Sequence, residues 1–219
     1  MLARGAGRRF VDAAGSYLPE AREGSGVYFP VLHGTSRAGN KSIRPAMYAA
    51  RRLKARGYET RLFSTMDLPF GDLRRREWEM EGPRPEVREF VREMARADGF
   101  VLVFPEYNHG YPGALKNVLD HLYDEWNRKP FALVTAGGVS GGLRAQENLL
   151  PVIRALQGVV VPKGVAVASV GRVFGEDGMP LDPATWEHRF DAMVDDLAWW
   201  ADALAAARAH AGAKASVTA

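Results

Sequence analysis

The chain has 219 residues, of which 47% are hydrophobic, 25% are charged and none is cysteine, and its net charge is +3. This length and composition predict one folded domain and exclude disulfides, thiolate metal sites and cysteine nucleophiles. The positive and negative charges are interspersed, which argues against nucleic acid as a partner. No apolar run approaches the ~20 residues of a membrane helix, which argues against a membrane as a partner.

The two ends of the chain differ in composition from its middle. Residues 1–26 carry arginines but lack the apolar core of a secretory signal, so we expect a cytoplasmic protein. We expect this N-terminal extension to be disordered or to bridge subunits. The domain is predicted at residues 27–205, and residues 206–219 are predicted to form a flexible C-terminal tail.

The first half of the domain alternates strand and helix patterns. Residues 27–32 are typical of a strand, although Pro30 removes a ladder donor. After the loop 34–42, in which Ser42 is the candidate N-cap, a helix is predicted. Its apolar face comprises Ile43, Ala46, Met47, Ala50 and Leu53. A strand at 58–63 and a polar connection at 64–85 follow. The next helix is amphipathic, with Val87, Phe90, Val91, Met94 and Ala95 on its apolar face.

The second half begins with the continuous apolar run 100–104, which is typical of a strand covered on both faces, and Pro105 ends it. A helix follows the loop 105–113, with its apolar face on Leu115, Val118, Leu119 and Leu122 and with Lys116, Asn117, Asp120 and His121 on its other sides. A strand is expected next at 131–135, followed by a helix at 143–157 that Pro151 is expected to kink. A last strand, or a broken pair of strands, is expected within 159–169. Asp182 and Pro183 then begin a long helix.

Strands that alternate with helices predict an α/β fold, a three-layer, doubly wound sandwich around a five-stranded parallel sheet. Three glycine-containing loops each leave the carboxyl end of a strand, at 34–42, 105–113 and 136–142. Since ligands of open α/β sheets bind outside these ends, the three loops are predicted to line one crevice.

Each loop leaves several interpretations open. Residues 34–42 (GTSRAGNKS) suit a phosphate but depart by one residue from the nucleotide P-loop spacing, and an ordinary capped turn is the alternative. Gly138, Ser140 and Gly142 match the GxSxG pattern of serine esterases, in which His188 would be the base. His109 alone is more often structural than catalytic. No residue cluster has metal spacing, so no metal is expected.

Together, GTSRAGNKS at 34–42, PEYNHGYPGALKN at 105–117 and GGVSGGLRAQ at 137–146 resemble the NADPH-dependent FMN reductase family, over about residues 27–205. These are flavodoxin-like proteins that include quinone, azo-dye and chromate reductases. The resemblance implies a sheet of order 2-1-3-4-5 with FMN at its switch point. It also implies an assembly, a homodimer or homotetramer.

The resemblance carries site residues over from the three motifs. The FMN phosphate would be held by Thr35, Arg37, Asn40, Lys41 and Ser42. The isoalloxazine would be bordered by Pro105, Glu106, Tyr107, Asn108, His109 and Gly110, and its pyrimidine side by Gly137, Gly138 and Ser140. No side chain would be an obligate catalyst.

The implied function is oxidation of NADPH or NADH, with FMN as cofactor, and reduction of a quinone, azo compound or similar small acceptor, or of FMN itself. Two alternatives stay open at this point. One is an FMN-binding electron carrier or regulator without enzymatic activity, and the other is the Ser140 esterase.

Overall fold

The computed structural model describes residues 26–71, 76 and 84–217, with side chains to residue 210. The predicted extension therefore lies outside the described residues, except for Gly26. Parallel strands form a six-stranded sheet of order β2-β1-β3-β4-β5, with β6 also paired to β4. This confirms the predicted α/β fold and the 2-1-3-4-5 order, and it resolves the last strand as a broken pair.

The strands are short at the edges of the sheet and long at its centre. They are β1 (Val31–His33), β2 (Leu62–Ser64), β3 (Phe100–Pro105), β4 (Pro130–Gly137), β5 (Val159–Val160) and β6 (Val165–Ala168). All of β3 is buried, as its unbroken apolar run predicts. β5 pairs with the first two residues of β4, and β6 pairs with its last four, so both occupy the same edge position.

β1 begins at Val31, later than the predicted residue 27, and Pro30 accounts for the difference. The N–H groups of Phe29 and Val31 donate to carbonyls of Glu59 and Arg61 on the β2 side. Because donors alternate sides along a strand, the missing N–H of Pro30 is one that would face β3. Pro30 still accepts from Val101 through its carbonyl, at 3.1 Å. The proline therefore costs one ladder bond at the start of the strand.

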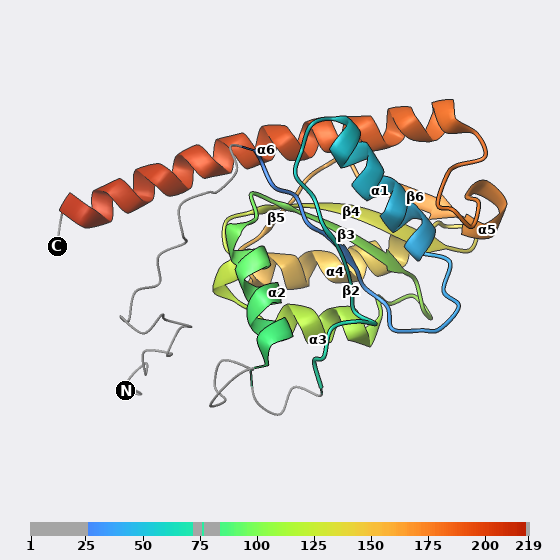
Figure 1. Cartoon of the computed structure of the whole chain (residues 1–219), viewed down its shortest axis with the longest axis horizontal. Helices are drawn as coiled ribbons and strands as arrows, with labels where there is room; N and C mark the ends of the chain where they lie inside the picture. The colour runs from blue at the N-terminus through green and yellow to red at the C-terminus, as the bar shows by residue number, and fades with distance from the viewer. Residues whose placement is uncertain (1–25, 72–75, 77–83, 218–219) are drawn as a thin grey trace.

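Helices cover both faces of the sheet (Figure 1). On one face lie α1 (Ile43–Ala55) and α6 (Pro183–Val217). On the other lie α2 (Pro85–Arg96), α3 (Gly113–His121) and α4 (Leu143–Ala155). A short helix α5 (Val170–Val173) follows β6, and the 3-10 turn η2 (Asp124–Trp126) follows α3. The sheet thus separates two hydrophobic cores, one beneath α1 and α6 and one beneath the other three helices.

Two predicted helix faces were wrong in part. In α1 the buried stripe includes Tyr48 and Ala49, whereas Met47 is only half-buried. The stripe is rotated because the Tyr48 ring packs on Phe174 and Phe190, at 5.7 and 5.0 Å between ring centroids. The helical periodicity of the sequence does not show these partners, which are distant along the chain.

In α3, His121 is 2% exposed and not on the solvent side as predicted. The Phe70 ring stacks on its imidazole at 4.5 Å, and its Nε2 lies 3.4 Å from the carbonyl oxygen of Gly71. The segment after β2 therefore covers a residue that the helical pattern alone placed in solvent.

The long helix α6 begins after Asp182, at Pro183, as the sequence predicts. It continues to Val217, beyond residue 205, where the helix was expected to end. Its last turns extend beyond the sheet (Figure 1). Among the described residues, no helix combines the length and the hydropathy that crossing a membrane requires.

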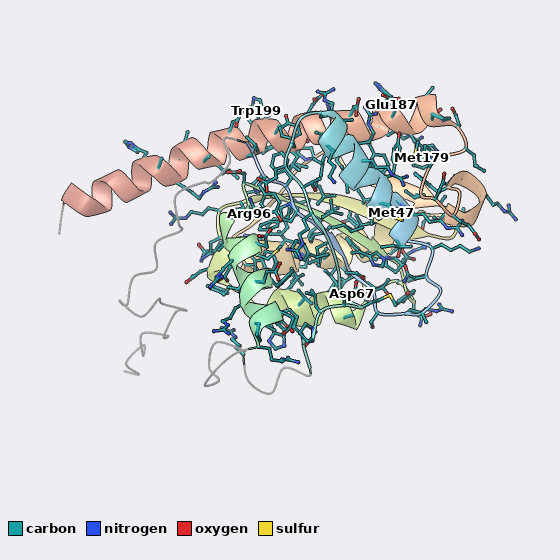
Figure 2. All side chains as sticks on the ribbon, viewed as in Figure 1. Met47, Asp67, Arg96, Met179, Glu187 and Trp199 are labelled. Carbon is teal, nitrogen blue, oxygen red and sulfur yellow. The ribbon has the colours of Figure 1, made fainter. Side chains whose placement is uncertain are left out.

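An ion-pair cluster joins α1 to α6. Arg52 donates to both carboxylate oxygens of Asp191, at 2.9 and 2.8 Å, and lies 2.9 Å from Glu187. Figure 2 shows Glu187 on the first turns of α6, on the same side of the molecule as α1. Burial by itself lowers the pKa of Arg52, but the hydrogen bonds to Asp191 and the charges of Asp191 and Glu187 raise it above its ordinary value.

We expect Arg52→Ala to lower the free energy of unfolding by about 1–3 kcal/mol, because it leaves the half-buried Asp191 without its bidentate partner. Urea denaturation followed by tryptophan fluorescence measures the change. Lys54→Ala, at an exposed position on the same helix, is the control and should change the midpoint little. Equal losses in the two variants would contradict a specific tie between α1 and α6.

Candidate functional site

A cavity of about 480 Å³ lies at the carboxyl edge of the sheet. The loops that follow β1, β3, β4 and β6 form its walls, so the crevice lies where the topology predicts it. Most of the predicted site residues line it, namely Arg37, Asn40, Lys41, Ser42, Pro105, Glu106, Tyr107, Gly137 and Gly138. Three segments far apart in the sequence therefore meet at one site.

The other predicted residues lie next to this cavity and do not line it. They are Thr35, Asn108, His109, Gly110 and Ser140. Thr35 is 1% exposed, and its hydroxyl lies 2.9 Å from the hydroxyl of Tyr107. This contact ties the loop after β1 to the loop after β3. The guanidinium carbon of Arg37 lies 5.8 Å from the centre of the Tyr107 ring.

The start of α1 is capped by Asn40, and the prediction of Ser42 as the capping side chain was wrong. Asn40 Oδ1 accepts from the backbone N–H of Ile43 at 3.2 Å and from the Ser42 hydroxyl at 3.0 Å. Ser42 makes no capping bond, because its hydroxyl is buried against Nε2 of His33, at 2.9 Å. The N-terminus of α1 is the positive end of the helix dipole, which favours an anion. The first turn contains no acidic side chain that would already provide that negative charge.

The loop after β3 is a tight turn with a rigid backbone. Tyr107 and Gly110 exchange two backbone hydrogen bonds, of 2.9 and 3.0 Å. Between them Asn108 and His109 have φ of 50° and 68°, as a type I′ turn requires at both central positions. The Asn148 side chain on α4 donates to the carbonyl of His109 at 2.7 Å. The turn therefore fixes backbone groups at the edge of the cavity and leaves both central side chains exposed.

Glu106 joins the loop after β3 to the start of α4. Its Oε2 accepts from the backbone N–H groups of Arg144 and Ala145, at 3.1 and 3.3 Å. Gly142, the N-cap residue of α4, has no side chain to make these bonds. Glu106 is thus a helix cap supplied by a different loop, and its carboxylate is also 3.7 Å from the Arg144 guanidinium.

The loop after β4 folds back on itself and leaves no room for a side chain at Gly137. A Cβ on Gly137 would lie 2.6 Å from the backbone nitrogen of Gly142, whereas one on Gly138 would meet nothing within 4 Å. Gly141 and Gly142 have φ of 63° and 91°, which L-residues rarely adopt.

The Ser140 hydroxyl lies 3.5 Å from the Arg144 guanidinium. In the part of the chain that the structure describes, no hydrogen bond joins it to a histidine, and His188 is exposed on α6.

The charges on the cavity wall are mostly positive. Arg37, Lys41 and Arg172 line it, and the one carboxylate among the lining residues, Glu106, already has cationic and backbone partners. The described residues contain no group of three His, Cys, Asp or Glu side chains arranged for a metal ion. The cavity therefore suits an anionic organic ligand.

The fourth wall of the cavity was not predicted from the sequence. Ser169, Val170, Gly171 and Arg172 follow β6 and line the cavity together with Ala136. The terminal atoms of Lys41 lie so close to Gly171 that a Cβ there would be 2.7 Å from Nζ. The sequence contained a signal for this wall. The segment follows the carboxyl end of a strand, β6, just as the three predicted loops follow the carboxyl ends of theirs.

His33, the last residue of β1, is a further residue of this region that was not predicted from the sequence. Its imidazole is fully buried, with Nδ1 3.1 Å from the Ser64 hydroxyl and Nε2 2.9 Å from the Ser42 hydroxyl. Burial lowers the pKa of His33 from 6.5 to about 4, against smaller opposing effects of Asn40 and Asp67. The ring is therefore neutral at neutral pH. No side-chain pattern in the sequence distinguishes this histidine from an ordinary core residue.

Comparison with known proteins gives a family for this arrangement. A family model described as NADPH-dependent FMN reductase matches residues 29–172, which include every loop of the cavity. An FMN-dependent NADPH-azoreductase from Staphylococcus aureus is 28% identical over 179 residues, covering 76% of this chain and 91% of that protein.

Other similarities are shorter or structural. An NAD(P)H-dependent FMN reductase from Schizosaccharomyces pombe is 62% identical over 50 residues, which are 23% of this chain and only 25% of that relative. One from Saccharomyces cerevisiae is 43% identical over 37% of this chain and 42% of its own length. In structure, the chain resembles a flavoenzyme NAD(P)H:(acceptor) oxidoreductase from Paracoccus denitrificans, with a TM-score of 0.66 and 23% identity. That similarity covers 78% of this chain and 97% of the other, and it shows the shared fold.

Proposed function

The chain belongs to the NADPH-dependent FMN reductase family, and from that premise we propose that it is an FMN-dependent oxidoreductase. It oxidises NADPH or NADH and reduces a small-molecule acceptor, such as a quinone, an azo compound or free FMN. One observation carries the proposal. A cavity of about 480 Å³ with a cationic wall lies at the sheet edge where this fold binds flavin, and its volume suits a small-molecule ligand.

The loop after β1 provides the phosphate end of the proposed FMN site. Arg37 and Lys41 supply positive charge, and the N-terminus of α1 supplies backbone N–H groups and a favourable dipole. Asn40 and Ser42 contribute by shaping the loop, since their side chains bond to each other and to backbone. Thr35 has a supporting role, because its buried hydroxyl contacts Tyr107.

The loops after β3 and β4 provide the ring end. We assign Pro105, Glu106 and Tyr107 to one border of the ring, together with the backbone of Asn108, His109 and Gly110 in the rigid turn. Gly137, Gly138 and Ser140 border the opposite edge. The open space beside Gly138, where a Cβ would meet no atom, lets a flat ring approach the backbone closely.

When bound, FMN supplies the redox chemistry that links NAD(P)H to the acceptor. The residues of the chain bind the phosphate, orient the ring and hold the loops rigid. Glu106 is bonded to two backbone N–H groups at the start of α4, so its carboxylate is a structural group and not a free base. No side chain is assigned a proton transfer. Single substitutions should therefore lower activity by graded amounts.

The alternatives differ in their support. The Ser140 esterase is not favoured, because the Ser140 hydroxyl contacts Arg144 and lacks a histidine partner among the described residues. An electron carrier or regulator would bind FMN in the same cavity. It would not oxidise NAD(P)H at catalytic rates with an added acceptor, and this separates the two functions.

We propose a homodimer or homotetramer in the cytoplasm as the working form. Val139 and Leu143 support an assembly, because they stand 101% and 48% exposed beside the loops of the cavity. Light scattering coupled to size exclusion measures the mass. A monomer at micromolar concentration would contradict the assembly. The lack of cysteine is compatible with a reducing compartment.

The test of the proposed function is spectroscopic and kinetic. The purified protein should bind FMN one to one, with a shift in the flavin absorbance spectrum. It should then oxidise NADPH or NADH in steady state with a quinone or an azo dye. A colourless protein that does not bind added FMN would contradict the proposal, and FMN binding without NAD(P)H oxidation would favour the electron carrier.

We expect Arg37→Ala to weaken FMN binding by roughly 10- to 100-fold, the loss of one charge-assisted hydrogen bond to phosphate. Quenching of FMN fluorescence on titration with protein measures the dissociation constant. Riboflavin, which lacks the phosphate, should bind both forms equally. Arg51→Ala is the matched control, because Arg51 is exposed on α1 and bonds to the Asp177 carbonyl away from the cavity. Unchanged FMN affinity in Arg37→Ala would refute the phosphate assignment.

A further inference from the structure

A chain of hydrogen bonds runs beneath the cavity, from the end of β2 to the start of α1, and His33 is at its centre. Nδ1 of His33 contacts the Ser64 hydroxyl at 3.1 Å, and Nε2 contacts the Ser42 hydroxyl at 2.9 Å. The Ser42 hydroxyl in turn contacts Asn40 Oδ1 at 3.0 Å. His33 is 0% exposed and Ser42 is 2% exposed, so the hydrogen bond between them is shielded from water.

The amide of Asn40 sets the direction of the whole chain. One of its atoms lies 3.2 Å from the backbone nitrogen of Ile43, and the other lies 2.8 Å from the carbonyl oxygen of Arg37. Only oxygen can accept from a backbone N–H, and only nitrogen can donate to a carbonyl, so the orientation of the amide is fixed. The atom facing Ser42 is therefore an oxygen without hydrogen, and the Ser42 hydroxyl must donate to it.

The tautomer of His33 follows from this direction. The single hydroxyl proton of Ser42 is already used, so its oxygen must accept, and Nε2 of His33 must carry the ring proton. In a neutral ring Nδ1 is then an acceptor, and the Ser64 hydroxyl donates to it. The Ser64 oxygen also accepts from the backbone N–H of Met66, at 3.3 Å. Each bond in the chain has one possible direction.

We propose that His33, as the Nε2–H tautomer, is a positioning residue that holds residues 37–42 in the conformation that binds an anion. The inference rests on the proposed FMN site. Its physical path is short, because the Ser42 hydroxyl donates to Asn40, and Asn40 both caps α1 and donates to the Arg37 carbonyl. The backbone N–H groups of the loop and the stem of Arg37 thereby keep their places before a ligand arrives, which lowers the entropic cost of binding.

Two amide variants that differ only in reach test the role of His33. The amide nitrogen of His33→Gln reaches the position of Nε2 and can donate to Ser42, whereas that of His33→Asn reaches only the position of Nδ1. In the full-length protein, FMN titration should give an affinity within about threefold of wild type for His33→Gln. For His33→Asn the affinity should be about tenfold weaker, the effect of one lost buried hydrogen bond.

Two controls accompany this pair. Ser64→Ala removes only the partner of Nδ1 and should leave FMN affinity within about threefold of wild type, while far-UV circular dichroism verifies that every variant folds. Histidine ¹⁵N NMR of the full-length wild-type protein, with the signals assigned through His33→Gln, should show a protonated Nε2 and an unprotonated Nδ1 at neutral pH.

The outcomes separate the inference from the function on which it rests. Equal FMN affinities of the two amide variants, or the opposite tautomer in the NMR spectrum, would overturn the positioning role while wild-type binding left the proposed function standing. A wild-type protein that has the expected tautomer but does not bind FMN would overturn the proposed function, and the role of His33 in it.

Discussion

Gly137→Ala is expected to lower the free energy of unfolding by about 1–3 kcal/mol, the cost of forcing a methyl group into packed structure, and to weaken FMN binding at least tenfold. A Cβ on Gly137 would lie 2.6 Å from the nitrogen and 3.1 Å from the Cα of Gly142. Both are backbone atoms at the start of α4, so a side-chain rotation cannot relieve the contact. The loop after β4 must move, and Gly138 moves with it at the cavity wall.

Gly138→Ala is the matched control, because it adds the same methyl group one residue later, where nothing lies within 4 Å. Its stability in urea should equal that of wild type within about 0.5 kcal/mol. Its FMN affinity should fall if the flavin ring occupies the space beside Gly138. Equal stability of the two variants would contradict the backbone packing at Gly137, and unchanged FMN affinity in Gly138→Ala would contradict the placement of the ring.

The fold was predictable because the central strands are apolar runs that alternate with helical patterns. Residues 100–104 form a short apolar run that is typical of a strand covered on both faces, and the structure buries all of β3. The alternation of such runs with helical patterns leaves few topologies. The short strands were less predictable: β1 and β2 are three residues each, and the start of β1 depends on Pro30.

The cavity was predictable to the extent that its residues follow strand ends in the sequence. Arg37, Tyr107 and Gly138 are examples, because the strand–loop–helix pattern places each of them at the same edge of the sheet. Contacts between loops were not predictable in this way. Glu106 caps a helix that begins after the next strand, and the Thr35 hydroxyl contacts the hydroxyl of Tyr107. These depend on distances between segments, which periodicity does not contain.

The role of His33 depends on still finer detail. In the sequence it is a polar residue at the end of a strand, next to the glycine loop, and nothing there shows that Ser64 and Ser42 lie on opposite sides of its ring. The parallel register places Ser64 of β2 opposite His33 of β1. The start of α1 then returns over the same residue. Burial between two hydroxyl groups is therefore a property of the tertiary fold.

Acid should destabilise the protein through His33 by about 3 kcal/mol between pH 7 and pH 4, in addition to what the carboxylates contribute. The pKa of His33 falls to about 4 in the folded state because its imidazole is buried, whereas the unfolded chain has the ordinary value of 6.5. Between these values the unfolded state binds the proton and the folded state does not. Stability is thus fully present above pH 6.5 and is lost as the pH falls toward 4.

The difference between wild type and His33→Gln isolates this contribution, because the carboxylates titrate in both proteins and cancel. Glutamine does not titrate, so the difference in free energy of unfolding, wild type minus variant, should decrease by about 3 kcal/mol as the pH falls from 7 to 4. Urea denaturation at constant ionic strength, followed by tryptophan fluorescence, measures both curves. Parallel curves would mean that His33 titrates alike in the folded and unfolded chains, which its complete burial between Ser64 and Ser42 argues against.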